Sequence, residues 1–195
     1  QKTGLAAGRT KKMTITGMLG AISVVLGFTP LGFIPIGLAN VTTMHIPVII
    51  GAIVEGPFVG AMVGLIFGIS SLIKSFMTPT PISFIFMNPL VSVVPIVLIG
   101  ILTYYFYTAM KKVVRYEKTV LLMSGAFGTL VNTVLVLGTA YLLYAQRIVE
   151  AMSLPEGGAF AFFMGIATTN GVPEMIVAAV VTAASVTAIK KIVKN

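Results

Sequence analysis

The chain has 195 residues, of which 57% are hydrophobic and only 9% are charged, and its mean hydropathy is +1.04. So little polar surface excludes a soluble globule and predicts an integral membrane protein. The net charge of +8 lies in three short basic clusters between apolar segments, which is typical of cytoplasmic loops beside anionic lipid and argues against nucleic-acid binding. Because there is no cysteine, disulfides, cysteine nucleophiles and thiolate metal sites are excluded as well.

Residues 1–11 are expected to form a cytoplasmic tail, whose first eight residues are either a frayed terminus or an addition to the natural chain. The apolar stretch from Met13 to Phe28 follows a basic group, as in a signal peptide. No small-residue cleavage site comes after it, so we expect a retained helix. Residues 12–195 are then a single transmembrane domain.

Six apolar stretches fit the remaining length, since a bilayer core of about 30 Å needs about 20 helical residues. If the N-terminus is cytoplasmic, every Lys and Arg except Lys74 and Arg147 faces the cytoplasm. The sequence therefore predicts an all-α integral membrane protein with six transmembrane helices and both termini cytoplasmic. The stretches, the second of them short for a full span, lie near 12–29, 43–55, 58–75, 86–109, 119–145 and 161–189.

Two outer segments, 30–42 and 75–87, hold no charge and are rich in proline and aromatic residues. A loop that faced only water would rarely be so apolar, so we expect both to fold back over the bundle as lids. In the third span Gly60, Gly64 and Gly68 recur every four residues. They form one flat helix face, which predicts close packing against another helix.

His45 is the single histidine, at the outer start of the second span. A metal site needs further His or carboxylate ligands, and none is suitably spaced. Two interpretations remain, a buried and hydrogen-bonded histidine or a contact to a substrate. The neighbouring Asn40, Thr42 and Thr43 favour the substrate contact.

Glu174 lies within the sixth span, where a carboxylate costs about 2–3 kcal/mol or more to insert and needs a partner inside the protein. The expected partners are Asn170, one turn earlier, and the backbone carbonyl that Pro173 leaves free. Asn88 and Asn132 fall at a similar depth. This convergence favours a pocket that opens outward, and polar contacts between helices are the alternative.

Lys74 and Arg147 are the outer cations, and an anionic ligand would require one of them nearby. Lys74 could instead extend to the lipid headgroups, and Arg147 could pair with Glu150 or Glu156 in its own loop. The candidate substrate-binding residues are Asn40, Thr43, His45, Lys74, Asn88, Asn132, Arg147, Asn170 and Glu174.

The sequence lacks the motifs of an ATPase or an intramembrane enzyme. No Gly-x-x-x-x-Gly-Lys-Ser/Thr phosphate loop and no Gly-x-Ser-Gly occurs, and the five acids are scattered. An independent ion-coupled carrier would show repeated halves and charge pairs within the membrane, and neither is found. The chain is not expected to be an enzyme or to need a cofactor.

Several stretches carry a resemblance to a known family: Thr16-Gly-Met-Leu-Gly-Ala-Ile-Ser, Thr29-Pro-Leu-Gly-Phe-Ile-Pro, Met44-His-Ile-Pro-Val-Ile, Glu55-Gly-Pro-Phe-Val-Gly-Ala and Gly64-Leu-Ile-Phe-Gly-Ile-Ser-Ser. Together with the length and the six spans, they resemble the substrate-binding S components of energy-coupling factor (ECF) vitamin transporters. The resemblance covers most of the chain and leaves out the first eight residues.

The resemblance implies a mechanism and partners. S components bind a vitamin in an outward-facing pocket, dock to a transmembrane coupling protein (the T component), and deliver the cargo as two cytosolic ATPases turn over. The family's first helix docks through an Ala-x-x-x-Ala face, and the matching residues here are Gly17 and Ala21. The resemblance also implies location in the plasma membrane of a prokaryote.

Within the family, Met-His-Ile-Pro after the first outer loop resembles the pantothenate-specific group most. Pantothenate is a small anion with hydroxyls and an amide, which suits Asn and Thr groups with one cation. Glu174 would oppose an anion unless it is paired or protonated. Folate is the second candidate, followed by riboflavin, hydroxymethylpyrimidine and cobalamin, and an independent secondary transporter is the remaining alternative.

Overall fold

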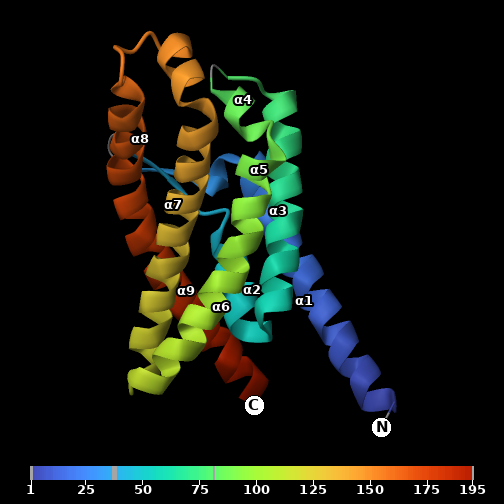
Figure 1. Cartoon of the computed structure of the whole chain (residues 1–195). Helices are drawn as coiled ribbons and strands as arrows, with labels where there is room; N and C mark the ends of the chain where they lie inside the picture. Colours follow the sequence, from blue (N-terminus) through green and yellow to red (C-terminus); the bar gives the residue numbers. More distant parts are fainter. Residues whose placement is uncertain (1, 37–38, 81, 195) are drawn as a thin grey trace.

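The computed structural model describes residues 2–36, 39–80 and 82–194, without the side chains of 2–7, 9, 31, 33–36, 39–41, 193 and 194. Long helices lie side by side in a bundle, and the start of α1 and the end of α9 lie at the same end of it (Figure 1). The elements are α1 (Lys2–Phe28), the 3-10 turn η1 (Pro30–Gly32), β1 (Phe33–Ile36), β2 (Ala39–Thr42), α2 (Ile46–Glu55), α3 (Pro57–Met77), α4 (Ser83–Phe86), α5 (Pro89–Ser92), α6 (Val94–Val113), α7 (Glu117–Ala151), α8 (Gly158–Thr169) and α9 (Gly171–Lys194).

The predicted helical membrane architecture is confirmed, with differences in the number of long spans. The stretch predicted as the second span is α2, whose 10 residues are about 15 Å long, half of a bilayer core. The predicted sixth span is divided into α8 and α9 at Asn170. The described helices that are long and apolar enough to cross a membrane are Thr10–Phe28, Pro57–Met77, Pro89–Val113, Glu117–Ala151 and Gly158–Ile192.

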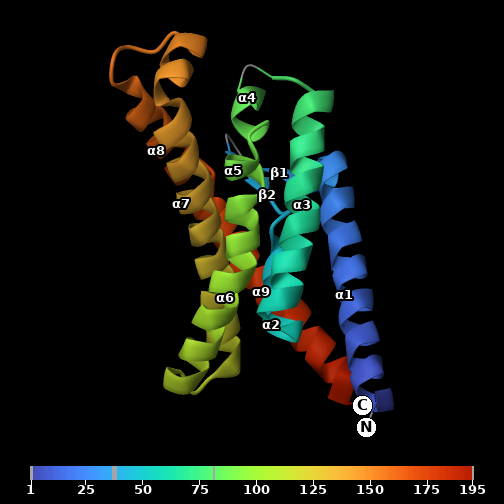
Figure 2. The ribbon, with the colours of Figure 1, turned by 45° about the vertical axis from the view of Figure 1, so that its right-hand side comes forward.

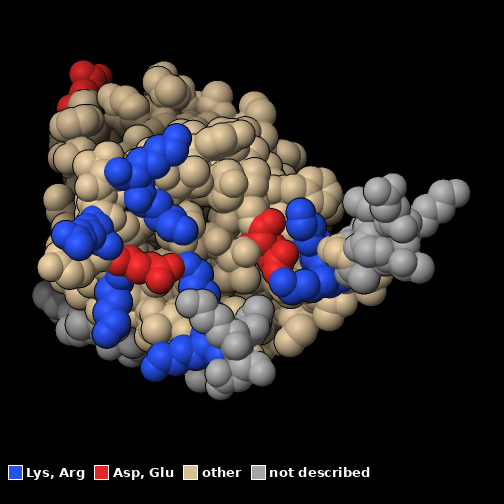
Figure 3. All heavy atoms as spheres, turned by 90° about the horizontal axis from the view of Figure 1, so that it is seen from below, with Lys and Arg blue, Asp and Glu red and all other residues tan. Residues whose placement is uncertain are grey.

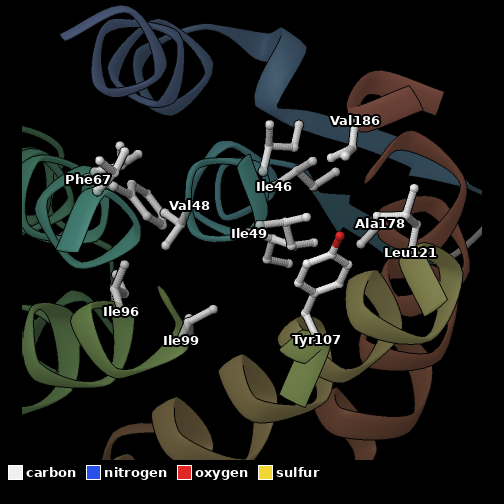
Figure 4. Close-up of a cluster of buried hydrophobic side chains, with 14 of the residues drawn as sticks. Ile46, Val48, Ile49, Phe67, Ile96, Ile99, Tyr107, Leu121, Ala178 and Val186 are labelled. Carbon is white, nitrogen blue, oxygen red and sulfur yellow. The ribbon is translucent and has the colours of Figure 1, made fainter. Parts of the chain in front are cut away.

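The short helix α2 lies inside the bundle. All residues from Ile46 to Ile53 are buried, and Val48 and Ile49 have no exposed surface. They pack with Phe67 of α3 and Ile99 of α6 in the main hydrophobic core (Figure 4). An apolar helix this short is stable in the membrane because its neighbours, rather than lipid, surround it.

The glycine face of α3 packs closely against α2, α5 and α6, as predicted. A Cβ atom at Gly64 would lie 2.6 Å from the carbonyl oxygen of Ile96, and one at Gly68 would lie 2.8 Å from that of Ser92. A side chain larger than hydrogen would therefore separate these backbones. At the other end of α3, Gly56 has a φ of 101° and forms the turn that joins α2 to α3.

The outer segment 30–42 was expected to be a loop, and it contains η1 and a two-stranded antiparallel hairpin. Phe33 of β1 lies opposite Thr42 of β2, and Ile36 lies opposite Ala39. The second outer segment, 75–87, contains the end of α3 and the short helix α4. Both segments lie in the half of the bundle away from the start of α1, as Figure 2 shows. Extended backbone in the first segment corrects the all-α prediction locally.

Basic side chains gather at the end of the molecule where α6 turns into α7 (Figure 3). Two ion pairs lie there: Lys11 Nζ is 2.8 Å from Glu55, and Lys190 pairs with Glu117. The opposite end carries Lys74 and Arg147, near the last turns of α3 and α7. The basic residues of the first group are Lys11, Lys12, Lys111, Lys112, Arg115, Lys118, Lys190 and Lys191.

Candidate functional site

A cavity of about 530 Å³ lies in the half of the bundle away from the basic end. Small-molecule pockets in proteins usually measure about 300–1,000 Å³, so this one has room for a vitamin-sized ligand. Its walls come from the end of α1, the residues just before α2, the C-terminal half of α3, α4, α5, the start of α6, α7, and the junction of α8 and α9. The apolar part of the lining includes Phe67, Ile85, Val91, Ile96, Val136, Leu137, Phe162 and Phe163.

The fold brings several of the predicted polar residues to this cavity. His45, Lys74, Asn132, Asn170 and Glu174 all line it, although they come from separate parts of the chain. The packing of α3, α7 and α9 around α2 places these side chains around one space. Of the residues expected to converge because of their similar depth, His45, Asn132, Asn170 and Glu174 line this cavity and Asn88 does not.

Glu174 of α9 is buried, and its partner is Thr42 at the end of β2. Its Oε1 accepts hydrogen bonds from the Thr42 backbone N–H at 2.8 Å and from the Thr42 hydroxyl at 2.7 Å. Asn170, the partner expected from the sequence, bonds to Glu174 through its backbone, as its carbonyl oxygen accepts from the Glu174 N–H at 3.0 Å. Two donors compensate the burial of the carboxylate and tie the hairpin to α9.

His45 is both buried and part of the cavity lining, so the two interpretations of it are compatible. Its Nε2 lies 2.9 Å from the hydroxyl oxygen of Thr129 on α7. In the tautomer that carries its proton on Nε2, His45 donates to the Thr129 oxygen, and the Thr129 hydroxyl donates to the Gly125 carbonyl at 3.2 Å; in the other tautomer Thr129 donates to Nε2. Within the described residues, no three His, Cys, Asp or Glu side chains lie together to hold a metal ion.

The structure separates the two outer cations. Lys74 is half-buried and lines the cavity, and its Nζ donates to the carbonyl of Gly27 near the end of α1. Arg147 is exposed and does not line the cavity. Its guanidinium lies 4.3 Å from the centre of the Phe84 ring on α4, a cation–π contact. Of these two, Lys74 is the cation that a ligand in the cavity would meet.

Asn88 and Thr43 are not among the residues that line the cavity. Asn88 caps α5 by accepting from the Leu90 N–H, and its side-chain amide donates to the Tyr144 hydroxyl at 3.0 Å. Both hydrogen bonds are made within the protein, so they account for Asn88 as a structural residue. Thr43 is buried, and its hydroxyl has no hydrogen-bond partner in the described part of the chain. The side chain of Asn40 lies outside the described residues.

Hydroxyl groups that were not predicted from the sequence line much of the cavity. The lining includes Ser71 and Ser75 of α3, Thr80 before α4, Ser83 of α4 and Thr133 of α7. A signal for part of this set exists in the sequence, because Ser70, Ser71, Lys74 and Ser75 recur at helical spacing near the end of the third span. Serine and threonine in membrane helices are also common as packing residues, so the signal is weak.

On α1, Gly17 and Ala21 are exposed, and a Cβ atom at Gly17 would meet nothing within 4 Å. The helix stretch that contains them is 17% buried, which is less than the other candidate spans of the described residues. A face of small residues is therefore open on α1 to lipid or to another protein.

This chain is similar to proteins of one known family. The family model described as ECF transporter, substrate-specific component, matches residues 11–186. The pantothenic acid transporter PanT of Lactococcus lactis subsp. cremoris (strain MG1363) is 32% identical over 168 residues, which cover 79% of this chain and 80% of that protein. The pantothenate transporter PanT of Leuconostoc mesenteroides subsp. mesenteroides is 26% identical over 189 residues, which cover 92% of each chain.

Proposed function

Because this chain belongs to the family of substrate-specific components of ECF transporters, we propose that it is the pantothenate-binding subunit of such an importer. The two relatives are named as transporters of pantothenate, and the family is one of transporters and not of enzymes. The protein itself is a multi-pass membrane protein of the plasma membrane.

The observation that carries the proposal is the cavity of about 530 Å³ with Lys74, Asn132 and Asn170 in its walls. Pantothenate has a carboxylate, an amide, hydroxyls and a dimethyl group. An ammonium, two carboxamides and the apolar walls offer a partner to each of these groups. Glu174, which would repel an anion, already accepts two hydrogen bonds from Thr42.

The proposed topology has six membrane segments, one of which is the short helix α2, and both termini are in the cytoplasm. The basic end of the bundle supports this orientation, because Lys and Arg concentrate on the cytoplasmic side of membrane proteins. The cavity then opens outward. In this proposal residues 12–195 form one substrate-binding domain and residues 1–11 a cytoplasmic tail.

We further propose the partners that such a subunit needs. A transmembrane coupling protein and two cytosolic ATPases supply the docking platform and the ATP hydrolysis. Gly17 and Ala21 are the docking residues, a role supported by their exposure on α1. The substrate-binding residues are His45, Lys74, Asn132, Asn170 and Glu174, which share the cavity.

Equilibrium binding of labelled pantothenate to the detergent-purified protein tests the proposal. A nanomolar Kd is expected, equivalent to about −12 kcal/mol, with folate and riboflavin failing to compete. A folded protein that does not bind pantothenate, or that binds folate more tightly, would refute the assignment of the cargo.

A further inference from the structure

The cavity has a charge polarity along its walls. Among the described residues that line it, the charged ones are Lys74 on α3 and Glu174 on α9. The energy of an anionic ligand group is lower near Lys74 and higher near Glu174. Both effects are stronger than in water because the walls are apolar. A ligand with one charged end therefore has a preferred direction in this cavity.

The α3 wall offers a second donor beside Lys74. The hydroxyls of Ser70 and Ser75 donate to the carbonyls of Phe67 and Leu72, each at 2.7 Å, so their protons are already used. Ser71 lines the cavity, and its side chain forms no hydrogen bond with the residues that the structure describes.

Ser71 and Lys74 are three residues apart on one helix, which places them on the same face. A hydroxyl and an ammonium that line one cavity from adjacent helical turns can both donate to a carboxylate. The α3 wall therefore has the composition of a carboxylate subsite.

The opposite wall offers neutral groups. Asn132 and Thr133 of α7 and Asn170 at the start of α9 line the cavity, and their side chains form no hydrogen bond with other described residues. Each carboxamide has an NH₂ group that donates hydrogen bonds and a carbonyl oxygen that accepts them, and a hydroxyl group can do both. Such groups match ligand hydroxyls and an amide, which also donate and accept.

We propose that Ser71 and Lys74 bind the ligand's carboxylate and that Asn132, Thr133 and Asn170 bind its hydroxyl and amide end. This fixes the direction of the ligand and makes Ser71 and Thr133 specificity-determining residues. The inference rests on the proposed binding of pantothenate. It predicts that selectivity for an acid over a neutral analogue is located on α3 and not on α7 or α9.

The test compares pantothenate with the alcohol analogue in which a CH₂OH group replaces the carboxylate. Both affinities are measured by calorimetry on the purified protein and its variants. Lys74→Met should weaken pantothenate binding about 10- to 100-fold and change binding of the alcohol by less than about 3-fold. Asn170→Ala should weaken both ligands by the same factor. Lys74→Arg, which keeps the charge, should keep the preference for the acid.

A matched pair of serine variants keeps the test independent of any folding defect at Lys74. Ser71→Ala should weaken pantothenate about 3- to 10-fold more than it weakens the alcohol. Ser75→Ala should not discriminate, because that hydroxyl already donates to the Leu72 carbonyl. If the wild-type protein binds pantothenate but the α3 variants lose acid and alcohol equally, the orientation is wrong and the proposed cargo stands. If the wild-type protein binds neither ligand, both proposals fail.

Discussion

The bond between Thr42 and Glu174 allows a quantitative prediction about the outer half of the fold. Thr42→Val keeps the shape of the side chain and the backbone N–H donor but removes the hydroxyl that lies 2.7 Å from Glu174 Oε1. Loss of one hydrogen bond to a buried carboxylate costs about 1.5–3 kcal/mol. For a chain of this size each kcal/mol lowers the Tm by about 2–4 °C, so the expected loss is about 3–12 °C.

Thermal unfolding of the detergent-purified protein measures this loss. Thr187→Val is the matched control, because the Thr187 hydroxyl donates to the Ala183 carbonyl of its own helix. Removing this hydroxyl takes no hydrogen bond away from a buried carboxylate. In a Glu174→Ala background the effect of Thr42→Val should nearly vanish. A Tm for Thr42→Val equal to that of the control, or an equal loss in both backgrounds, would refute the assigned coupling between β2 and α9.

The remaining predictions concern packing, docking and ligand binding. Gly64→Leu should lower the stability by about 1–3 kcal/mol or more, because a Cβ atom alone would lie 2.6 Å from the Ile96 carbonyl oxygen. The loss is measured as a lower Tm, and an unchanged Tm would contradict the described packing of α3 on α6. Gly17→Leu and Ala21→Leu should leave the Tm and pantothenate binding unchanged and abolish pantothenate uptake by cells, whereas full uptake would remove these residues from the docking face. Asn132→Ala and Asn170→Ala should each weaken pantothenate binding about 3- to 10-fold, and unchanged affinity in both would move the ligand out of the cavity.

The features that the sequence predicted well depend on composition and on helical periodicity. Hydropathy identified the membrane helices, and the four-residue spacing of Gly60, Gly64 and Gly68 identified a packing face that the structure places against α2, α5 and α6. The cost of burying a carboxylate predicted that Glu174 has a partner within the protein. Each of these inferences needs only the local sequence and the properties of the bilayer.

Features that depend on contacts between distant residues could not be predicted from the sequence. The partner of Glu174 is 132 positions away, at the end of the β1–β2 hairpin, and their approach depends on how the hairpin packs against α9. Lys74 and Arg147 looked equivalent in the sequence, and only the packing of α3 and α7 places the first on the cavity and the second over an aromatic ring. The role of Asn88 as the cap of α5 depends on where that helix begins, which was not predicted from the sequence. Without that boundary, Asn88 was counted among the ligand-binding residues.

The burial of α2 also bears on how the chain assembles during biosynthesis. A helix of 10 residues is too short to be retained in the bilayer as an independent segment. It is joined through the single residue Gly56 to α3, which is long enough to span, so we expect the two to enter the membrane together as a helical hairpin. The helices α6, α7 and α9 that enclose α2 follow it in the chain. The centre of this bundle is therefore completed only after α9 has been synthesised.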